Sequence, residues 1–578
     1  MASSPDSLPD TSSEPPCDAQ WWRAAVIYQV YPRSFADSDG DGVGDLPGVI
    51  AHLDHIAGLG VDAVWLSPVY RSPQRDNGYD VSDYQDIDPS FGTLADLDEL
   101  IRELHRRGMR LIMDLVVNHT SDEHPWFIAS RQNRTGATAD WYLWRDARPG
   151  TIPGQAGAEP NNWGAAFSGS AWQWVPERGQ YYLHLFSVEQ PDLNWDNPEV
   201  REAIFAMMNW WLDRGVDGFR MDVINFISKD PALPDGPVDR AGYGDGTPYF
   251  VYGPQVHTHL AEMKRRVFDH RSGSYLRVGE MPGVTPEQAR ELTDSKHGPL
   301  NMIFQFDHVY LDQDGDKWTP RPVSVSDLRD TLAHWQLALA DSGWNSLYWS
   351  NHDQPRAVSR FGNDSRYWRE SATALATLLH LHRGTPYVYQ GEELGMTNAP
   401  GESIDDFRDI ESLHHYADAV ERGEDPTVVL AALRRMSRDN ARTPMQWTSG
   451  RYGGFSTTKP WIPVNPNHHW LNAAAQVRDP HSIYYYYRAL IALRHQHHAV
   501  VDGEFVINET GRDQIYAFRR TAGNEAIETY VNLSDNPVSI DELEPNALVL
   551  LLGNYPESVR DTTRLAPWEA RVYRRRFG

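Results

Sequence analysis

Three acidic side chains lie at the ends of predicted strands in this sequence. Asp222 closes the predicted strand 216–222, Glu280 lies near the end of 275–281, and Asp353 follows 345–350. Arg220 lies two residues before Asp222, so both side chains project from one face of the strand. A guanidinium beside a carboxylate lowers the pKa of that carboxylate and keeps it ionised, as a carboxylate nucleophile requires. An isolated Arg-x-Asp pair would favour a structural salt bridge, so the chemical interpretation depends on the other two acids.

Further polar residues follow other predicted strands. They are Asp80, Asp114, Asn118, His119 and His352. The single cysteine, Cys17, excludes an internal disulfide and a cysteine-based zinc site. The histidines are not spaced as a metal triad, and we find no glycine-rich phosphate loop or nucleophile elbow. Paired carboxylates without a redox cofactor motif indicate acid–base and nucleophilic chemistry on an uncharged substrate, with glycoside hydrolysis as the leading case.

Composition limits the class of protein and its partners. The chain has 578 residues and a formal net charge of −27, which disfavours binding to nucleic acids and anionic membranes. No apolar run approaches the roughly 20 residues of a membrane span. The first residues lack the pattern of a signal peptide, and we expect residues 1–19 to form a disordered tail. A cytoplasmic protein is therefore expected.

From Trp21 onward, short apolar strands alternate with amphipathic helices. Helices are predicted at 46–59, 199–214, 255–269, 325–340, 369–382 and 481–498, among others. The eight predicted strands are 25–31, 61–66, 109–117, 216–222, 275–281, 300–306, 345–350 and 385–389. Eight strand–helix units favour the α/β class and a closed (β/α)₈ TIM barrel over an open sheet.

Breaks in this rhythm predict the domain organisation. The barrel would comprise residues 20–118 and 191–502, interrupted after its third strand by a small inserted domain at 119–190. A second insertion, 396–480, carries one predicted helix at 425–437. Short strands separated by Gly, Asp and Asn turns predict a C-terminal antiparallel β-sandwich at 503–578.

Six motifs resemble the α-amylase family of glycoside hydrolases, family 13, and most closely its oligo-1,6-glucosidase and α-glucosidase branch. They are Asp114-Leu-Val-Val-Asn118-His119, Gln190-Pro-Asp-Leu-Asn194, Gly218-Phe-Arg-Met-Asp222-Val-Ile-Asn225, Val278-Gly-Glu280, Ser350-Asn-His-Asp353-Gln and Ala441-Arg442-Thr-Pro-Met-Gln-Trp447. The similarity extends from about Trp21 to the C-terminus and is weakest in the last domain. The resemblance implies an enzyme of this family.

The resemblance assigns a role to each of the three acids. Asp222 would be the nucleophile that forms a glucosyl-enzyme intermediate, and Glu280 the general acid and then the base that activates water. Asp353 would bind the sugar 2- and 3-hydroxyls. We expect burial and neighbouring carboxylates to raise the pKa of Glu280. Two inversions retain the anomeric configuration, which requires the two reacting carboxyl groups to be about 5–5.5 Å apart.

The resemblance also implies binding residues around these acids. His119 and His352 would hydrogen-bond sugar hydroxyls, although both could be satisfied core histidines. Tyr79 would stack on the glucose ring. Arg220 would keep Asp222 ionised.

The resemblance also implies the mode of attack. In the similar enzymes the residues matching Asp80 and Arg442 cap the pocket at the non-reducing glucose, so that the enzyme removes one terminal unit. Asp80, in Asn-Gly-Tyr-Asp, could instead be a plain turn residue.

Linkage preference depends on Val223, directly after the predicted nucleophile. The resembling 1,6-specific enzymes carry Val there, whereas 1,4-preferring relatives carry smaller or hydroxylated residues. We therefore expect a retaining α-glucosidase for small oligosaccharides, with α-1,6 bonds favoured and α-1,4 bonds possible.

Two rival functions stay open at this stage. An α-glucosyl transferase or a sucrose- or trehalose-forming isomerase would use the same intermediate. A catalytically inactive sugar-binding relative is more remote, because Asp222, Glu280 and Asp353 are all present. The sequence leaves open whether the protein is a monomer or a homodimer.

A second motif predicts a structural Ca²⁺ or Mg²⁺ ion in the first strand–helix loop. Its expected ligands are Asp37, Asp39, Asp41 and Asp45. The resemblance adds the carbonyl of Val43, because the related enzymes bind Ca²⁺ or Mg²⁺ in this loop. The spacing matches the first half of an EF-hand loop, but Gly48 occupies the twelfth position, so Asp45 must replace the usual glutamate. An Asp/Gly turn without metal is the alternative. We expect no organic cofactor.

Overall fold

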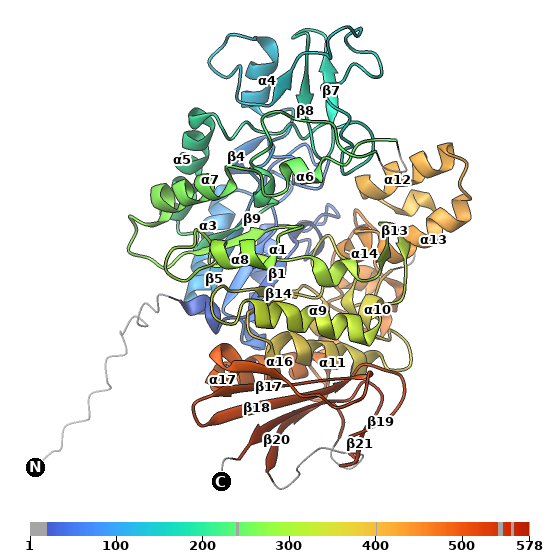
Figure 1. The fold of residues 1–578 in the computed structure, drawn as a ribbon. Coiled ribbons are helices and arrows are strands. Elements are labelled where there is room, and N and C mark those ends of the chain that lie inside the picture. Colours follow the sequence, from blue (N-terminus) through green and yellow to red (C-terminus); the bar gives the residue numbers. More distant parts are fainter. Residues whose placement is uncertain (1–19, 239–241, 400, 541–546, 557–559, 577–578) are drawn as a thin grey trace, which may run out of the picture.

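The computed structural model describes residues 20–238, 242–399, 401–540, 547–556 and 560–576 (Figure 1). The predicted tail at 1–19 lies outside the described residues. Eight parallel strands form one sheet in the order β11-β10-β9-β5-β2-β1-β15-β14. They are β1 (Ile27–Val30), β2 (Ala63–Leu66), β5 (Arg110–Leu115), β9 (Gly218–Met221), β10 (Leu276–Glu280), β11 (Met302–Phe304), β14 (Ser346–Leu347) and β15 (Thr385–Tyr389). A single bridge from Ile303 to Asn345 joins the two ends, so the predicted barrel is confirmed as nearly closed.

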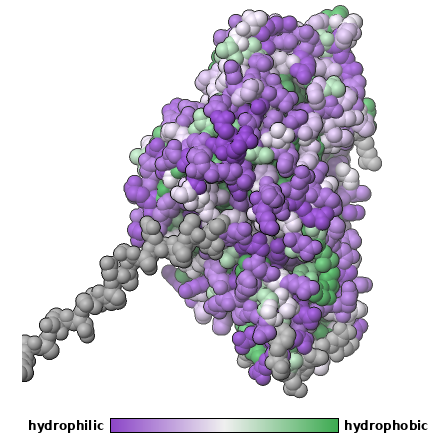
Figure 2. Space-filling view, turned by 60° about the vertical axis from the view of Figure 1, so that its left-hand side comes forward, coloured by the Kyte–Doolittle hydropathy of each residue, from purple (hydrophilic) through white to green (hydrophobic). Residues whose placement is uncertain are grey.

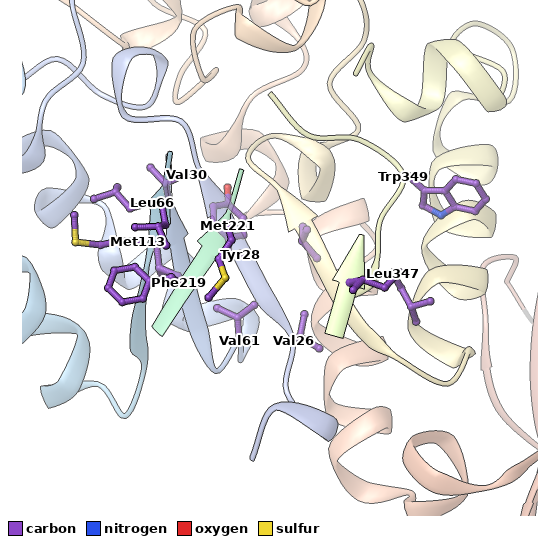
Figure 3. Packing of buried hydrophobic residues seen from close by; sticks show 14 of the residues in the cluster. Val26, Tyr28, Val30, Val61, Leu66, Met113, Phe219, Met221, Leu347 and Trp349 are labelled. Carbon is purple, nitrogen blue, oxygen red and sulfur yellow. The ribbon is translucent and has the colours of Figure 1, made fainter. Parts of the chain in front are cut away.

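Alternation along the strands divides the apolar side chains between two layers. In β2, Trp65 belongs to the cluster inside the barrel, whereas Val64 and Leu66 belong to the larger cluster that includes helix residues. Figure 3 shows side chains of this larger cluster, among them Tyr28 and Val30. Because both faces of a parallel barrel strand are buried, the strands read as continuous apolar runs in the sequence.

Helices cover the outside of the barrel. They include α3 (Leu94–Arg106), α5 (Pro198–Arg214), α8 (Pro286–Leu292), α9 (Val325–Ala338), α10 (Ala357–Phe361), α11 (Trp368–Leu381) and α16 (Ile483–Gln496). The single helix predicted at 46–59 is two helices, α1 (Leu46–Ala51) and α2 (Leu53–Leu59), because His52 leaves the helical conformation. The helix predicted at 255–269 is α7 (Val256–Met263) followed by a π-helical stretch, η4 (Lys264–Phe268).

Two insertions meet at one end of the barrel. The segment between β5 and α5 contains α4 (Pro125–Gln132) and a three-stranded sheet of β6 (Trp144–Arg145), β8 (Gln180–Leu183) and β7 (Trp172–Val175). The 396–480 insertion contains α12 (Ile410–Glu421), α13 (Pro426–Met436) and α14 (Asp439–Arg442), of which α12 and the short α14 are absent from the sequence-based prediction. His414 of α12 lies 2.9 Å from the carbonyl oxygen of Phe167, so the insertions touch.

The C-terminal strands form an antiparallel sheet in the order β16-β17-β18-β22-β20. These strands are β16 (Glu504–Ile507), β17 (Ile515–Ala522), β18 (Glu525–Asn532), β20 (Leu548–Gly553) and β22 (Ala570–Arg575). One face packs on the helices around the barrel through Tyr516 and Phe518. The other face carries Ile515 and packs on Leu565, in the short pair β19 (Val538–Ser539) and β21 (Arg564–Leu565). Among the described residues, the second layer of the predicted sandwich is therefore a two-stranded ribbon.

The surface agrees with the acidic composition. Figure 2 shows a face on which hydrophilic residues predominate and hydrophobic residues form small groups. Within the described residues, no helix combines the length and the apolar character needed to cross a bilayer.

Gly218 begins β9 and permits close approach of β10. A Cβ atom at this position would lie 2.3 Å from the carbonyl oxygen of Leu276. We predict that Gly218→Ala lowers the free energy of unfolding by at least about 3 kcal/mol, because overpacking adds to backbone strain. Urea denaturation followed by circular dichroism measures this loss. The control is Gly108→Ala, with a φ of +74° and no atom within 4 Å of the added Cβ, which should cost only about 1–2 kcal/mol. Equal losses in the two variants would contradict the close-approach argument.

Candidate active site

One buried guanidinium joins three carboxylates from neighbouring strands. Arg220 is fully buried, and its Nη1 lies 2.8 Å from Asp114 Oδ1 and 2.7 Å from Asp222 Oδ1. Its Nη2 lies 2.5 Å from Glu280 Oε1. The strand register explains the meeting, because Arg220 of β9 pairs with Asp114 of β5 and with Val278 of β10. The predicted nucleophile and the predicted acid therefore contact the same guanidinium.

Burial is the largest influence on the pKa values of Asp222 and Glu280. It raises the pKa of Asp222 to about 7 although Arg220 opposes the shift. The predicted low pKa of Asp222 is therefore wrong, because the sequence could not show that one guanidinium is shared by three buried carboxylates. Burial, together with Asp222 and Asp353, raises the pKa of Glu280 to about 8, in the direction predicted. Glu280 thus keeps its proton near neutral pH.

The pKa of Asp353 is shifted in the opposite direction, downward. Its Oδ1 accepts hydrogen bonds from Arg442 at 2.7 Å and from Arg438 at 3.3 Å, and its Oδ2 lies 3.2 Å from His352 Nε2. Burial alone would raise the pKa of Asp353, but these contacts hold it well below its usual range. Asp353 is therefore ionised under conditions in which Glu280 is protonated.

The predicted pair of Asp80 and Arg442 does not form. Asp80 is fully buried and accepts hydrogen bonds from Ser72 Oγ at 2.9 Å and from the backbone amides of Arg75 at 2.9 Å and Asp76 at 3.1 Å. It thus organises its own loop, as the turn alternative anticipated. Arg442 contacts Asp353 instead, so the assignment of these two residues as a cap is wrong.

A different ion pair lies beside the carboxylates. Arg438 Nη2 lies 3.0 Å from Asp76 Oδ1 and 2.6 Å from Asp409 Oδ1. Asp76, Arg438 and Asp409 are absent from the sequence-based prediction. Asp76 and Arg438 each lie four residues before the residue that was chosen, just ahead of the two motifs, so a check of neighbouring charges could have found them.

Tyr79 and His352, two residues predicted to contact sugar, lie against each other, and their contacts with sugar stay predictions. Its hydroxyl donates to Asp114 Oδ2 at 3.0 Å, and its ring stacks on His352 at 5.0 Å between centroids and 6° between planes. His352 Nδ1 lies 2.9 Å from Gln29 Nε2. Burial lowers the pKa of His352 to about 3, so this imidazole is neutral near neutral pH.

His119 is enclosed by protein groups. Its Nε2 lies 3.1 Å from the carbonyl oxygen of Tyr79 and 3.2 Å from Gln190 Nε2, and its Nδ1 lies 3.2 Å from Asn118 Nδ2. Burial lowers its pKa to about 4. These contacts fit the alternative of a satisfied core histidine, and its contact with sugar stays a prediction.

Val223 follows the predicted nucleophile in a strained conformation. Its φ is +35°, which is a genuine outlier for a β-branched residue. The amide of Val223 donates a hydrogen bond to Glu280 Oε2 at 3.2 Å, so the residue after Asp222 is joined to Glu280. Backbone strain of this kind is common at functional sites.

Comparison with known proteins agrees with this geometry. The model of the α-amylase catalytic domain matches residues 29–503. The chain belongs to the α-amylase family. It is thus a glycoside hydrolase of family 13, as predicted.

Relatives named for different activities align with this chain over nearly its whole length. The oligo-1,6-glucosidase of Parageobacillus thermoglucosidasius is 52% identical over 96% of this chain and 99% of its own length. The solved structure of trehalose-6-phosphate hydrolase from Bacillus licheniformis has a TM-score of 0.88, 42% identity and coverage of 96% and 99%. Isomaltulose synthase from Klebsiella sp. LX3 has a TM-score of 0.90, 40% identity and the same coverage.

The predicted ion loop gathers three of its four expected carboxylates, and the Val43 carbonyl stays a prediction. Asp37, Asp39 and Asp45 offer carboxylate oxygens that lie within 4.8 Å of one another. Asp41 does not join this group, and its Oδ1 accepts the amide of Val43 at 2.7 Å. Asp45 also caps α1 through the amide of Gly48 at 2.6 Å. Three converging carboxylate oxygens fit a hard cation such as Ca²⁺ or Mg²⁺.

Proposed function

We propose that this protein is a retaining, exo-acting α-glucosidase that hydrolyses terminal α-glucosidic bonds of short oligosaccharides. The observation that carries the proposal is the shared contact of Asp222 and Glu280 with Arg220, at 2.7 and 2.5 Å. It holds a potential nucleophile and a protonated acid on one guanidinium. The oligo-1,6-glucosidase that is 52% identical over nearly the full length supports the same activity.

In this mechanism the carboxylate of Asp222 attacks the anomeric carbon while Glu280 gives its proton to the departing glycosidic oxygen. The carbon–oxygen bond to the leaving sugar breaks, and an ester between Asp222 and glucose forms. Glu280, now ionised, takes a proton from water, which attacks the same carbon and releases Asp222. Asp353, held ionised by Arg438 and Arg442, accepts hydrogen bonds from the sugar 2- and 3-hydroxyls.

The charged residues beside Asp353 support removal of a single terminal unit. Arg438 lies between Asp76 and Asp353, at 3.0 and 3.3 Å. This arrangement offers alternating donors and acceptors, which suit the hydroxyl groups of one non-reducing glucose. Asp76 and Arg438 thus take the capping role that the sequence assigned to Asp80 and Arg442.

Transfer of glucose to a sugar is the second candidate function. The 40% identical isomaltulose synthase shares the fold, and the same glucosyl ester can react with a sugar hydroxyl in place of water. Product analysis separates the two functions: with sucrose alone, free glucose and fructose indicate hydrolysis, whereas a new disaccharide indicates isomerisation.

The partner in this proposal is a small neutral oligosaccharide. The net charge of −27 disfavours nucleic acid and anionic membranes as partners. A single cysteine in 578 residues suits a reducing compartment, and we propose the cytoplasm.

The reaction course tests the proposal. With p-nitrophenyl α-glucoside, whose leaving group is not a sugar, proton NMR at early times should show α-glucose as the first product, because two inversions retain the anomeric configuration. Asp222→Asn should lower kcat by at least about 10³-fold, because the nucleophile is lost. Asp213→Asn, on the exposed side of α5, is the matched control and should keep wild-type activity. Initial release of β-glucose, or an active Asp222→Asn enzyme, would contradict the proposal.

The pH dependence should follow the two raised pKa values. Below about 7, Asp222 holds a proton and cannot attack; above about 8, Glu280 has lost the proton that it must donate. We expect a bell-shaped profile of kcat/KM with its maximum between these values. Because the two acids interact, the two apparent pKa values of the profile describe the pair and not either residue alone. For Glu280→Gln, the profile measured with an aryl α-glucoside should lack the alkaline limb, because an activated leaving group departs without a proton from residue 280. A flat wild-type profile from pH 5 to 10 would be the contrary outcome.

Linkage preference should respond to Val223. Val223→Thr keeps the β-branched shape but adds a hydroxyl at the wall beside the nucleophile. We predict that the ratio of kcat/KM for isomaltose to that for maltose falls about tenfold, since such changes are worth about 1–3 kcal/mol. Activity on an aryl α-glucoside serves as the control and should change little. An unchanged ratio would remove Val223 from the account of specificity.

A structural Ca²⁺ or Mg²⁺ ion in the 37–45 loop is a further part of the proposal. If it binds, CaCl₂ at 100 times its Kd should stabilise the protein by about 2.7 kcal/mol over the EDTA-treated form. Thermal unfolding measures the difference, with MgCl₂ as a parallel arm. Asp39→Asn should abolish the response, and an identical Tm with and without both cations would rule the ion out.

A further inference from the structure

The barrel strand that leads to Asp353 is the shortest of the eight. Strand β14 contains only Ser346 and Leu347, which pair with Thr385 and Pro386 of β15. Asp353 follows six residues after Leu347, beyond any ladder pairing of that strand. The path from β14 to Asp353 must therefore be fixed by side-chain contacts rather than by the sheet.

Each of the three residues after Leu347 has such a contact. The hydroxyl of Tyr348 donates to the carbonyl of Gln305 at 2.8 Å, and the indole of Trp349 donates to the carbonyl of Leu375 at 2.8 Å. The third anchor differs in kind, because Ser350 Oγ donates at 2.8 Å to Glu392 Oε2, which is an ionisable group.

Glu392 connects this path to two other elements. It lies in η6 (Glu392–Leu394), directly after β15, and it is buried. Its second oxygen, Oε1, accepts a hydrogen bond from the hydroxyl of Tyr487 in α16 at 3.0 Å. The carboxylate thus ties the loop before Asp353 to the last barrel strand and to the closing helix.

The burial of the Glu392 carboxylate lowers the stability of the folded protein. Within the described residues its hydrogen bonds come from two hydroxyls and no ion pair involves it, although the charge of Arg356 lowers its pKa in part. Burial raises its pKa to about 7. A buried carboxylate without a contacting cation is unfavourable, so a purely structural role would be served better by a neutral side chain.

From Ser350 the path to Asp353 is short. The amide of Asp353 donates to Asn351 Oδ1 at 2.8 Å, which closes a turn immediately after Ser350. A shift of Ser350 therefore moves the turn that presents Asp353 to Arg438 and Arg442.

We propose that Glu392 is a positioning residue for Asp353, acting through Ser350. This inference rests on the proposed function, in which Asp353 binds the sugar 2- and 3-hydroxyls. Glu392 itself touches neither substrate nor the reacting atoms. Its loss should impair the contact between Asp353 and the 2-hydroxyl more than it impairs the fold.

Glu393 provides a matched control next to it in the chain. Its carboxylate is also buried, but it accepts from Tyr28 at 3.0 Å and lies 2.9 Å from His55 Nε2. No contact joins its side chain to Ser350 in the part of the chain that the structure describes. A general effect of removing a buried acid at this place should therefore appear equally in Glu393→Gln.

The experiment measures kcat/KM and Tm for Glu392→Gln, Ser350→Ala, the double variant and Glu393→Gln. The substrates are p-nitrophenyl α-glucoside and its 2-deoxy analogue. We expect Glu392→Gln and Ser350→Ala each to lose about 10–100-fold in kcat/KM on the first substrate, as misplaced groups do. The double variant should be little worse than the more impaired single variant, because coupled residues are not additive. Glu393→Gln should retain the wild-type kcat/KM.

The 2-deoxy substrate separates positioning from a general structural effect. It lacks the hydroxyl that Asp353 would hold, so the loss in Glu392→Gln relative to wild type should shrink to about threefold or less on it. An equal loss on both substrates, additive effects in the double variant, or an equal loss in Glu393→Gln would overturn the proposal. If the wild-type protein turns over neither substrate, the proposed function fails instead, which is a different result.

Discussion

A single buried guanidinium, that of Arg220, contacts the carboxylates of Asp114, Asp222 and Glu280. One positive charge among three acids in a buried site cannot support three full negative charges, because each unpaired buried charge is costly. The site therefore favours retention of a proton, and Glu280 has the highest pKa of the three, at about 8. The general acid that the mechanism needs follows from this imbalance of charge.

Asp353 lies in a neighbouring cluster with two guanidiniums, one of which, that of Arg438, also contacts Asp76 and Asp409. Two guanidiniums, from Arg438 and Arg442, contact the one carboxylate of Asp353 and keep it ionised. Both arginines come from the 396–480 insertion, whereas Asp353 follows a barrel strand. Asp353 is thus contacted by two guanidiniums, whereas Asp222 and Glu280 share one with Asp114, and the pKa values of these acids differ accordingly. This separation of pKa values is the usual way to assign acid and base roles within one site.

The sequence was sufficient where function depends on position along a strand. Asp222 and Glu280 could be predicted to meet because parallel strands bring their carboxyl ends to one edge of the barrel. The sequence was insufficient where a contact depends on the path of a loop. Asp76 and Arg438 each lie four residues from the residues selected, and no periodic pattern of a loop distinguishes them. The helix break at His52 was missed because apolar spacing continues across it.

Burial was the second property that the sequence could not supply. The pattern Arg-x-Asp correctly predicts that Arg220 and Asp222 touch, but the direction of the pKa shift depends on how many other acids share the guanidinium. Helix α12 was missed for a related reason, because only Ser412 and Ala419 are buried in it and its apolar face is narrow. The C-terminal strands were predicted as a sandwich, but strand patterns do not report how large the second layer is.

The most direct test of this account is kcat/KM of the Arg220→Lys variant on an aryl α-glucoside. Lysine keeps the positive charge but replaces a planar fork by one ammonium group, which cannot span Asp114, Asp222 and Glu280 together. The account predicts a loss of at least about 10³-fold in a variant that stays folded. A folded Arg220→Lys enzyme within about tenfold of wild type would contradict the central role of the shared guanidinium.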